Sequence, residues 1–296
     1  MTAFRVTERS IATNILVGLQ GNLSKLGDIQ QRLSSGKQIS KPSDSPTGTV
    51  AAMQYRGDLA TAKQYARNAD DGLGWLGLTD GTLGNIMGEV QRTRELALQG
   101  MSNGSGGSAD AREAIATEID QIHDATIGLA NTRYGDRPIF GGTTTGPAAY
   151  DASGTYLGDG GVVQRTVGDN VKVPVGTPGP AAFGAGTGQL FQIMSDIATD
   201  LRTNPSALST DLDRLDAVTT TLKAVQSAVG ARYNQVTQMQ QFAYDKVDSL
   251  SSQLSDVEDI DLPKTISDMQ LQQVAYQAAL AAGAKVVQPS LVDFLR

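Results

Sequence analysis

The chain is predicted to be mainly α-helical. We expect a nested antiparallel coiled-coil bundle of long helices, formed by the N- and C-terminal regions, with a small β-rich insert between them. Near both ends, apolar residues recur at alternating three- and four-residue steps, the spacing of a coiled-coil seam. Aromatic residues make up only 5% of the 296 residues, which suits thin helical packing. The middle of the sequence loses the helical period and is rich in Gly, Pro and Thr.

The first helix is expected over residues 8–34, and it should end at the small residues Ser35 and Gly36. Pro42 and Pro46 then predict an extended connector, because proline disfavours helix in the residue before it. The leucines that keep the coiled-coil step, interrupted only by Gln30, are Leu16, Leu19, Leu23, Leu26 and Leu33.

A very long second helix is predicted from the series that runs from Ala52 to Ala97. This series keeps the three- and four-residue step throughout, and only Asp80 and Arg94 in it are charged. Several glycines weaken its middle by up to about 1 kcal/mol each relative to alanine. The helix should end in the Gly- and Ser-rich loop 100–108.

A third helix is predicted to start near Ser108 or Asp110 and to end at Tyr134-Gly135-Asp136. Asp110 with Glu113 resembles a capping box at its start. Its buried face is marked by residues at helical spacing, which are Ile115, Ile119, Ile122, Thr126 and Leu129.

The insert is predicted over residues 141–188. Two strand-like runs, 162–167 and 171–175, are separated by a turn-forming stretch around Gly168 and Asn170. We therefore expect short paired strands here rather than helices.

The helical pattern resumes near Gln189, pauses at Pro205, and continues as a long helix over 215–257. Asp261-Leu262-Pro263 should break this helix, and the final helix should stop before Pro289. The stripe residues of the final helix are Leu271, Val274, Ala278 and Ala281.

This pattern predicts three domains. Residues 1–40 with 262–296 would form a terminal coiled-coil domain, 41–140 with 189–261 a long-helix bundle, and 141–188 the insert. The first and last helices gain most of their stability from packing, since helices of this kind are marginal alone in water. Their stripe residues are therefore the predicted subunit interface, which indicates a subunit of an assembly.

Charge and composition argue against several functions. A net charge of −7 and a pI near 4.8 disfavour binding to nucleic acid or to an anionic membrane surface. The sequence has no run of about 18 apolar residues, so no membrane-spanning helix is predicted. The chain has no cysteine, which excludes disulfides and thiol chemistry. The N-terminal residues do not resemble a cleaved secretory signal, so export would need another route.

No catalytic, cofactor-binding or metal-binding residue is predicted, and we do not expect an enzyme. The single histidine, His123, is interpreted as a surface or boundary residue. Gly36-Lys37 lacks the first glycine of a phosphate loop, and the glycines at 184–188 lack the last one of the dinucleotide pattern. The acidic pairs Asp70-Asp71 and Glu258-Asp259 are interpreted as solubilising charge. An intracellular coiled-coil scaffold and an enzyme hosted in the insert are the alternatives.

Several runs resemble the bacterial flagellin superfamily. Ser34–Pro46 is similar to its "SSGKRINxPSDDP" signature, with Ser45 in place of the usual second Asp. Asn68–Gly72 resembles its "RNxxDG" element, and Gln91–Gln99 its "QRxRELAxQ" run. Residues 271–279 resemble the terminal flagellin helix. These motifs lie within the first 140 and last 100 residues.

Two further runs resemble the superfamily members at the junction between hook and filament. Arg137–Thr145 is similar to their "YIFGGTKT" run, and Val287–Arg296 to their C-terminal ending. The resemblance implies a structural adaptor between hook and filament on which flagellin polymerises. The filament subunit, flagellin itself, is the alternative.

The resemblance also implies partners and a location. The protein would self-assemble and contact flagellin, the neighbouring hook-associated protein on the hook side, and a flagellar export chaperone. It would lie in the extracellular flagellum, exported by the flagellar type III system without a cleaved signal peptide. Its terminal helices would form an inner tube, with the insert facing outward.

Overall fold

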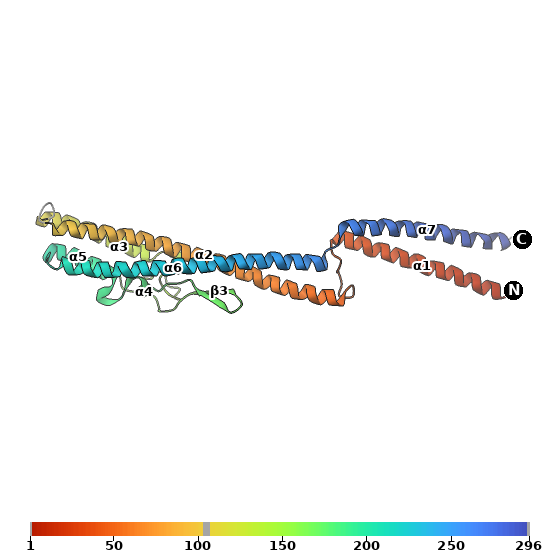
Figure 1. Cartoon of the computed structure of the whole chain (residues 1–296), viewed down its shortest axis with the longest axis horizontal. Coiled ribbons are helices and arrows are strands. Elements are labelled where there is room, and N and C mark those ends of the chain that lie inside the picture. Colours follow the sequence, from red (N-terminus) through yellow and green to blue (C-terminus); the bar gives the residue numbers. More distant parts are fainter. Residues whose placement is uncertain (1, 103–106, 295–296) are drawn as a thin grey trace. The chain divides into compact units, whose positions relative to one another are not determined.

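The computed structural model describes the backbone of residues 2–102 and 107–294, and side chains at residues 10, 13–102 and 107–284. Within these residues the chain is mainly helical, which confirms the predicted fold class (Figure 1). The elements in chain order are α1 (Thr2–Ser35), α2 (Pro46–Met101), α3 (Ala109–Ala130), β1 (Arg133–Tyr134), β2 (Arg137–Pro138), β3 (Gln164–Gly168), β4 (Val171–Pro174), α4 (Gly179–Phe183), the 3₁₀ turn η1 (Gly186–Gly188), α5 (Leu190–Thr203), α6 (Leu208–Glu258) and α7 (Leu262–Phe294).

The chain divides into two compact units. Unit 1 comprises Met1–Ala60 with Asp248–Arg296, and unit 2 comprises Thr61–Val247. Helices α2 and α6 each contribute to both units, because each boundary falls within one of these helices. The three-domain division, with its boundaries at the connector and around the insert, stays a prediction.

The bounds of the terminal helices differ from the prediction. Helix α1 begins at Thr2 rather than near residue 8. The expected stop before Pro289 is wrong, since α7 continues through this proline to Phe294. A proline removes one backbone donor and crowds the preceding turn, but its fixed φ near −65° is helical. Helical backbone on both sides can therefore continue across it.

Helix α3 is shorter than expected and starts with a different cap. The side chain of Ser108 accepts a hydrogen bond from Ala111 N at 3.1 Å, so Ser108 rather than Asp110 is the N-cap. The helix ends at Ala130 with Asn131 as C-cap. The next residues form a small antiparallel hairpin, β1–β2, whose turn includes Gly135 at φ +57°.

The insert contains little regular secondary structure beyond one predicted pair of strands. Strands β3 and β4 pair antiparallel, and Asn170 in their turn has φ 58°, a conformation that asparagine tolerates better than most residues. The rest is loop with one short helix, α4. Aromatic rings fill its centre, where Phe183 makes edge contacts with Phe140 at 4.8 Å and Tyr150 at 5.8 Å between ring centroids.

Unit 2 has a continuous apolar core to which α2, α3, α5, α6 and the insert all contribute. Helix α5 packs along α3 in this unit (Figure 1). The largest fully buried side chains are Trp75, Tyr150, Phe140, Phe183, Phe191, Leu76, Leu83, Ile86, Leu96, Ile119, Ile139 and Leu190. This core holds the insert against the helices.

Two glycines on the surface of α2 predict a route to a more stable protein. A Cβ added at Gly81 or Gly88 would meet no atom within 4 Å, and both residues lie in the helix interior. Replacing both with alanine should raise the free energy of unfolding of unit 2 by about 1–2 kcal/mol, because glycine costs up to about 1 kcal/mol per helical position. Urea denaturation measures this gain.

Gly74 provides the matched control on the same helix. A Cβ there would lie 2.5 Å from the hydroxyl of Tyr134, so this contact should cancel the helical gain of Gly74→Ala. Equal stabilisation by alanine at Gly74 and Gly81 would show that helix propensity alone decides the result.

Candidate assembly interface

Helices α1 and α7 lie side by side in unit 1 and run antiparallel (Figure 1). Two contacts show the antiparallel direction. Ile15 lies next to Gly283, and the later residue Asn22 on α1 bonds the earlier residue Gln272 on α7. A Cβ on Gly283 would lie 3.1 Å from Ile15 Cγ2, so glycine lets the helices approach closely there. The predicted pairing of the terminal helices is thus present within a single chain.

The seam between these helices follows a heptad, but it is thin. Its positions are half-buried, and the only buried residue among the described side-chain positions of α1 and α7 is Gly283. The seam residues are Ile15, Leu19, Asn22, Leu26, Ile29 and Leu33 on α1, and Thr265, Met269, Gln272, Tyr276, Ala279 and Gly283 on α7. Little apolar surface is therefore buried by the pair alone.

The predicted interface residues divide into two groups. Leu19, Leu26 and Leu33 lie in the seam within the chain. The remaining six are exposed, with Leu271 at 70% and Leu16 at 59%, and we call them the outer apolar set. The members of this set are Leu16, Leu23, Leu271, Val274, Ala278 and Ala281.

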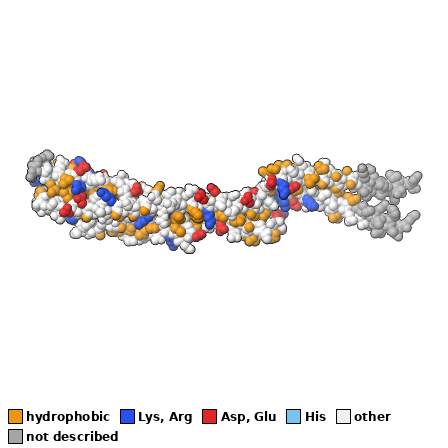
Figure 2. All heavy atoms as spheres, in the orientation of Figure 1, with side chains coloured by type: hydrophobic (Ala, Val, Ile, Leu, Met, Phe, Trp, Pro, Cys, Tyr) orange, Lys and Arg blue, Asp and Glu red, His pale blue; other side chains and the backbone are white. Residues whose placement is uncertain are grey.

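The two helices present the outer apolar set differently. At 100° per residue, the four α7 members lie on the face opposite the seam, whereas Leu16 and Leu23 lie beside it. Figure 2 shows apolar side chains along the exposed surface of the described part of α7. Sequence reasoning missed the exposed Val17, Ile266 and Leu280, since they lie outside the series with the coiled-coil step.

A polar cluster joins the base of α1 to the end of α6, and we call it the latch: Gly36, Lys37, Glu258 and Asp259. Gly36 has φ +70° and accepts a hydrogen bond from Ile260 N at 3.1 Å, while Gln38 N donates to Glu258 O at 2.6 Å. Two backbone hydrogen bonds therefore tie the chain just after α1 to the chain just before α7.

Side chains complete the latch. The Lys37 ammonium lies 2.6 Å from Asp259 Oδ1 and 3.3 Å from Glu258 Oε2, and Arg56 lies 2.7 Å from Glu258 Oε1. The Glu258 side chain is only 3% exposed. The interpretation of Glu258 and Asp259 as solubilising charge is therefore wrong, because both carboxylates hold the helix ends together.

The latch predicts a specific titration. The hydrogen bond from Lys37, followed by that from Ser255, lowers the pKa of Asp259, and the bond to Asp259 raises the pKa of Lys37. The Asp259 contribution to stability is present above its ordinary pKa of about 3.9 and is lost as pH falls through the lowered value. The Lys37 contribution is full below about pH 10.4 and is lost as pH rises through the raised value.

Replacing Lys37 with methionine should raise the pKa of Asp259 toward its ordinary value. Carboxyl chemical shifts of Asp259, followed by NMR across the acid range, measure this change. Lys41→Met removes a nearby lysine that contacts neither latch carboxylate and should leave the Asp259 titration as it is. An unchanged Asp259 pKa in the Lys37 variant would show that the ammonium does not control it.

The connector between α1 and α2 is fixed by its own side chains. Asp44 Oδ2 accepts from Ser40 N at 3.0 Å and Lys41 N at 2.9 Å, and these bonds lower its pKa. Ser45 Oγ accepts from Gly48 N at 3.1 Å, and Pro46 is the first residue of α2, as is common at helix starts. Serine thus provides the cap where the signature usually has a second Asp.

The "RNxxDG"-like element in unit 2 fastens α2 to its neighbours. Asn68 donates to Thr166 O at 2.7 Å, and Asp71 pairs with Arg165 at 2.5 Å. Asp70 accepts hydrogen bonds from two side chains of α6, those of Gln240 and Tyr244. The prediction that Asp70 and Asp71 are merely solubilising is therefore also wrong.

The "QRxRELAxQ"-like run, Gln91–Gln99, also connects α2 to neighbouring helices. Arg92 bonds Glu118 of α3 at 2.7 Å, and Arg94 bonds Asp216 of α6 at 2.8 Å. Both pairs are largely exposed, so solvent screens them and each contributes little to stability. The two ion pairs connect α2 to α3 and to α6.

The described residues offer little for chemistry. The His123 side chain is 15% exposed, with Nδ1 3.1 Å from Asp124 Oδ1, in keeping with a boundary residue. Within residues 2–102 and 107–294, no group of His, Asp and Glu has the arrangement of a metal site. Among the same residues, no helix has the length and apolarity that a membrane span requires.

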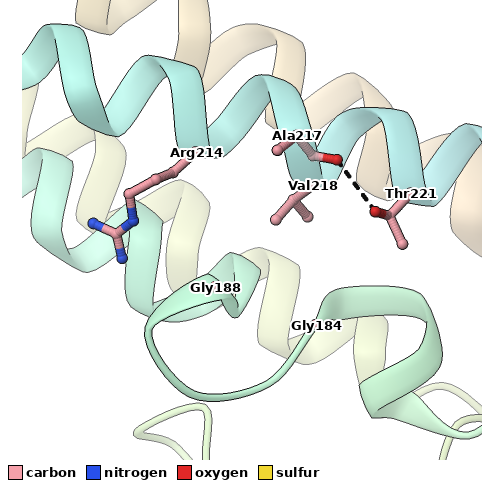
Figure 3. A pocket seen from close by; sticks show the side chains of 6 residues that line it. All are labelled: Gly184, Gly188, Arg214, Ala217, Val218 and Thr221. Carbon is pink, nitrogen blue, oxygen red and sulfur yellow. Dashed lines mark hydrogen bonds between the residues drawn. The ribbon is translucent and has the colours of Figure 1, made fainter.

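A pocket of about 240 Å³ lies between α6 and the loop 184–188 (Figure 3). Ala217 and Val218 line it from α6, and Gly184 and Gly188 from the loop. Arg214 at its edge already bonds Asp196 at 2.9 Å and Asp211 at 2.8 Å, and it donates to Thr187 O. The guanidinium therefore holds the loop in place.

Comparisons with known proteins agree with the motifs. The bacterial flagellin N-terminal helical region matches residues 6–145, and the C-terminal helical region matches residues 212–295. Flagellar hook-associated protein 3 of Escherichia coli (strain K12) is 26% identical over 278 residues, 85% of this chain and 87% of that protein. A flagellin of Salmonella muenchen is 38% identical over 116 residues, 38% of this chain and 23% of that protein.

A solved structure supports the fold. Flagellar hook-associated protein 3 from Legionella pneumophila has a TM-score of 0.61 and 13% identity, over 69% of this chain and 98% of that one. The two matched helical regions together span more than half of the chain and contain both sets of terminal motifs. The chain therefore belongs to the bacterial flagellin family.

Proposed function

We propose that this protein is a structural subunit of the bacterial flagellum that forms the adaptor between hook and filament, on which flagellin polymerises. The outer apolar set carries the assembly role. Six exposed apolar residues follow two helices whose seam buries little, and such surfaces commonly mark protein interaction sites. Burial of these residues between copies would supply the stability that the pair lacks alone.

The extent of similarity supports the junction role over the filament role. The similarity to hook-associated protein 3 extends over 85% of this chain and 87% of the relative. The flagellin match has higher identity, but it covers 38% of this chain and 23% of that flagellin. The similarity to the junction protein thus extends over most of both chains, whereas the flagellin match is limited to part of each.

The proposed partners follow from this position. The protein would contact its own copies, flagellin on one side and the neighbouring hook-associated protein on the other. Before assembly, an export chaperone would cover the terminal helices, whose exposed apolar side chains would otherwise associate. Export would use the flagellar type III system without a cleaved signal peptide. The proposed role is structural, with no catalytic step.

Immunogold labelling of intact flagella from the source bacterium tests the position. An antibody against the insert should give one patch at the boundary between hook and filament. Labelling along the whole filament would instead support the flagellin alternative. Flagella from a strain lacking the gene, complemented with the intact gene, control for antibody specificity.

A further inference from the structure

The seam between α1 and α7 contains one polar layer. Gln272 Nε2 donates to Asn22 Oδ1 at 3.2 Å and lies 3.3 Å from Asn22 O. Apolar seam residues lie one step away on either side, with Leu19 and Leu26 on α1. We call the pair Asn22–Gln272 the rung.

Apolar pattern alone does not specify how these helices pair. On α1 the series through Ile15, Asn22 and Ile29 contains five apolar residues and one amide. The series through Leu16, Leu23 and Gln30 also has five and one, because both share the same three leucines. Hydrophobic burial would thus favour the two faces about equally.

On α7 the face used within the chain is the more polar one. The seam there contains Thr265, Gln272 and Gly283, whereas the opposite face presents Leu271 and Val274. A contact other than apolar burial must therefore contribute to the choice of alignment.

We propose that the rung specifies the register in which α1 pairs with α7. Displacement by one heptad would place Asn22 opposite Thr265 or Ala279, and Gln272 opposite Ile15 or Ile29. Each displaced alignment sets at least one amide against an aliphatic side chain, which leaves a partly buried polar group without its partner. A single buried amide is a known determinant of coiled-coil register.

The latch acts at a different place. It anchors the base of the pair at Lys37. Asn22 of the rung lies 15 residues earlier in the chain, about 22 Å away along α1 at 1.5 Å per residue. The latch fixes the end of α1 next to the start of α7, and the rung fixes the alignment beyond that point. The register is a property of one chain, so this proposal does not rest on the proposed function.

The cysteine-free sequence permits a direct test in the purified monomer. Ile15→Cys with Gly283→Cys places two thiols where the seam is close, and their disulfide reports the observed register. Ile15→Cys with Tyr276→Cys forms a disulfide only after displacement by one heptad. Oxidation yields by mass spectrometry, under dilute conditions, compare these two reporters.

With the rung intact, the first reporter should oxidise nearly completely and the second very little. Replacing Asn22 and Gln272 with leucine should lower the first yield at least twofold and raise the second correspondingly. The swap Asn22→Gln with Gln272→Asn keeps an amide pair and should restore the original yields. Asn14→Leu with Gln277→Leu makes the same changes at exposed positions outside the seam and should alter neither yield.

Unchanged yields in the leucine variant would overturn the proposal, as would equal yields from both reporters with the rung intact. Circular dichroism at 222 nm checks that every variant retains its helices. The test is made on the monomer, so its result does not depend on where the protein lies in the flagellum. A correct register together with filament-wide labelling would contradict the proposed function and leave the rung's role in place.

Discussion

Leu271→Asp is expected to abolish incorporation of the protein into flagella while leaving the isolated chain as stable as before. The Leu271 side chain is 70% exposed and lies on the face of α7 opposite the seam, so an aspartate there remains in water in the monomer. When another copy covers this face, the carboxylate would be buried without a partner, which is costly. Motility, together with electron microscopy of hooks and filaments, measures the loss.

Two further variants separate the outer apolar set from the seam. Gln273→Asp introduces the same charge on the same helix, at an exposed position beside the seam and about 200° around the helix from Leu271, and should permit assembly. Leu26→Asp places the charge in the seam and should weaken the α1–α7 pair in the monomer. Normal filaments from the Leu271 variant would contradict burial of the α7 face in the assembly.

The sequence predicted the fold because helical periodicity extends over so many turns. It predicted a coiled-coil series through Leu16 and Leu23, which are exposed within the chain, for a physical reason: neighbouring residues on α1, such as Ile15 and Leu16, begin two series of equal apolar content. The structure uses the series that includes Asn22, whose polarity argued against a seam position. Its partner, Gln272, lies 250 residues away in the chain, so no local pattern could indicate the bond.

The latch and the small hairpin show the same limit. Glu258 and Asp259 read as surface charge because their cationic partners, Lys37 of the connector and Arg56 of α2, lie far away in the chain. Strands β1 and β2 have two residues each, too few to show alternation, and β2 ends in proline. Motifs could locate the important segments, but the contacts made by each residue required the three-dimensional structure.

Asn131→Ala is expected to lower the free energy of unfolding of unit 2 by about 3 kcal/mol. Asn131 Oδ1 accepts from the backbone N–H groups of Ala149 and Tyr150, each at 2.8 Å, and its Nδ2 donates to Tyr150 O at 2.9 Å. Ala149 and Tyr150 are at most 1% exposed. Alanine would leave these backbone groups buried without partners, at about 1–3 kcal/mol per group before relaxation.

The loss should extend beyond the backbone, because Tyr150 is central to the aromatic cluster. Its ring lies 5.2 Å from that of Tyr156 and 4.8 Å from that of Phe191, so the asparagine fixes the insert against α5. Thermal unfolding should shift downward by roughly 6–12 °C, since 1 kcal/mol corresponds to about 2–4 °C in a unit of this size. Near-ultraviolet circular dichroism should weaken with it.

Asn85→Ala is the matched control, the same change at an exposed position of α2, and it should be neutral or slightly stabilising. Asn131→Asp keeps the acceptor for both N–H groups but loses the donor to Tyr150 O, so its effect should be intermediate. An Asn131→Ala variant that unfolds at the same temperature as Asn85→Ala would show that the aromatic cluster holds the insert without the asparagine. The graded series thus measures how much one polar side chain at the end of α3 contributes to an insert that has little regular secondary structure of its own.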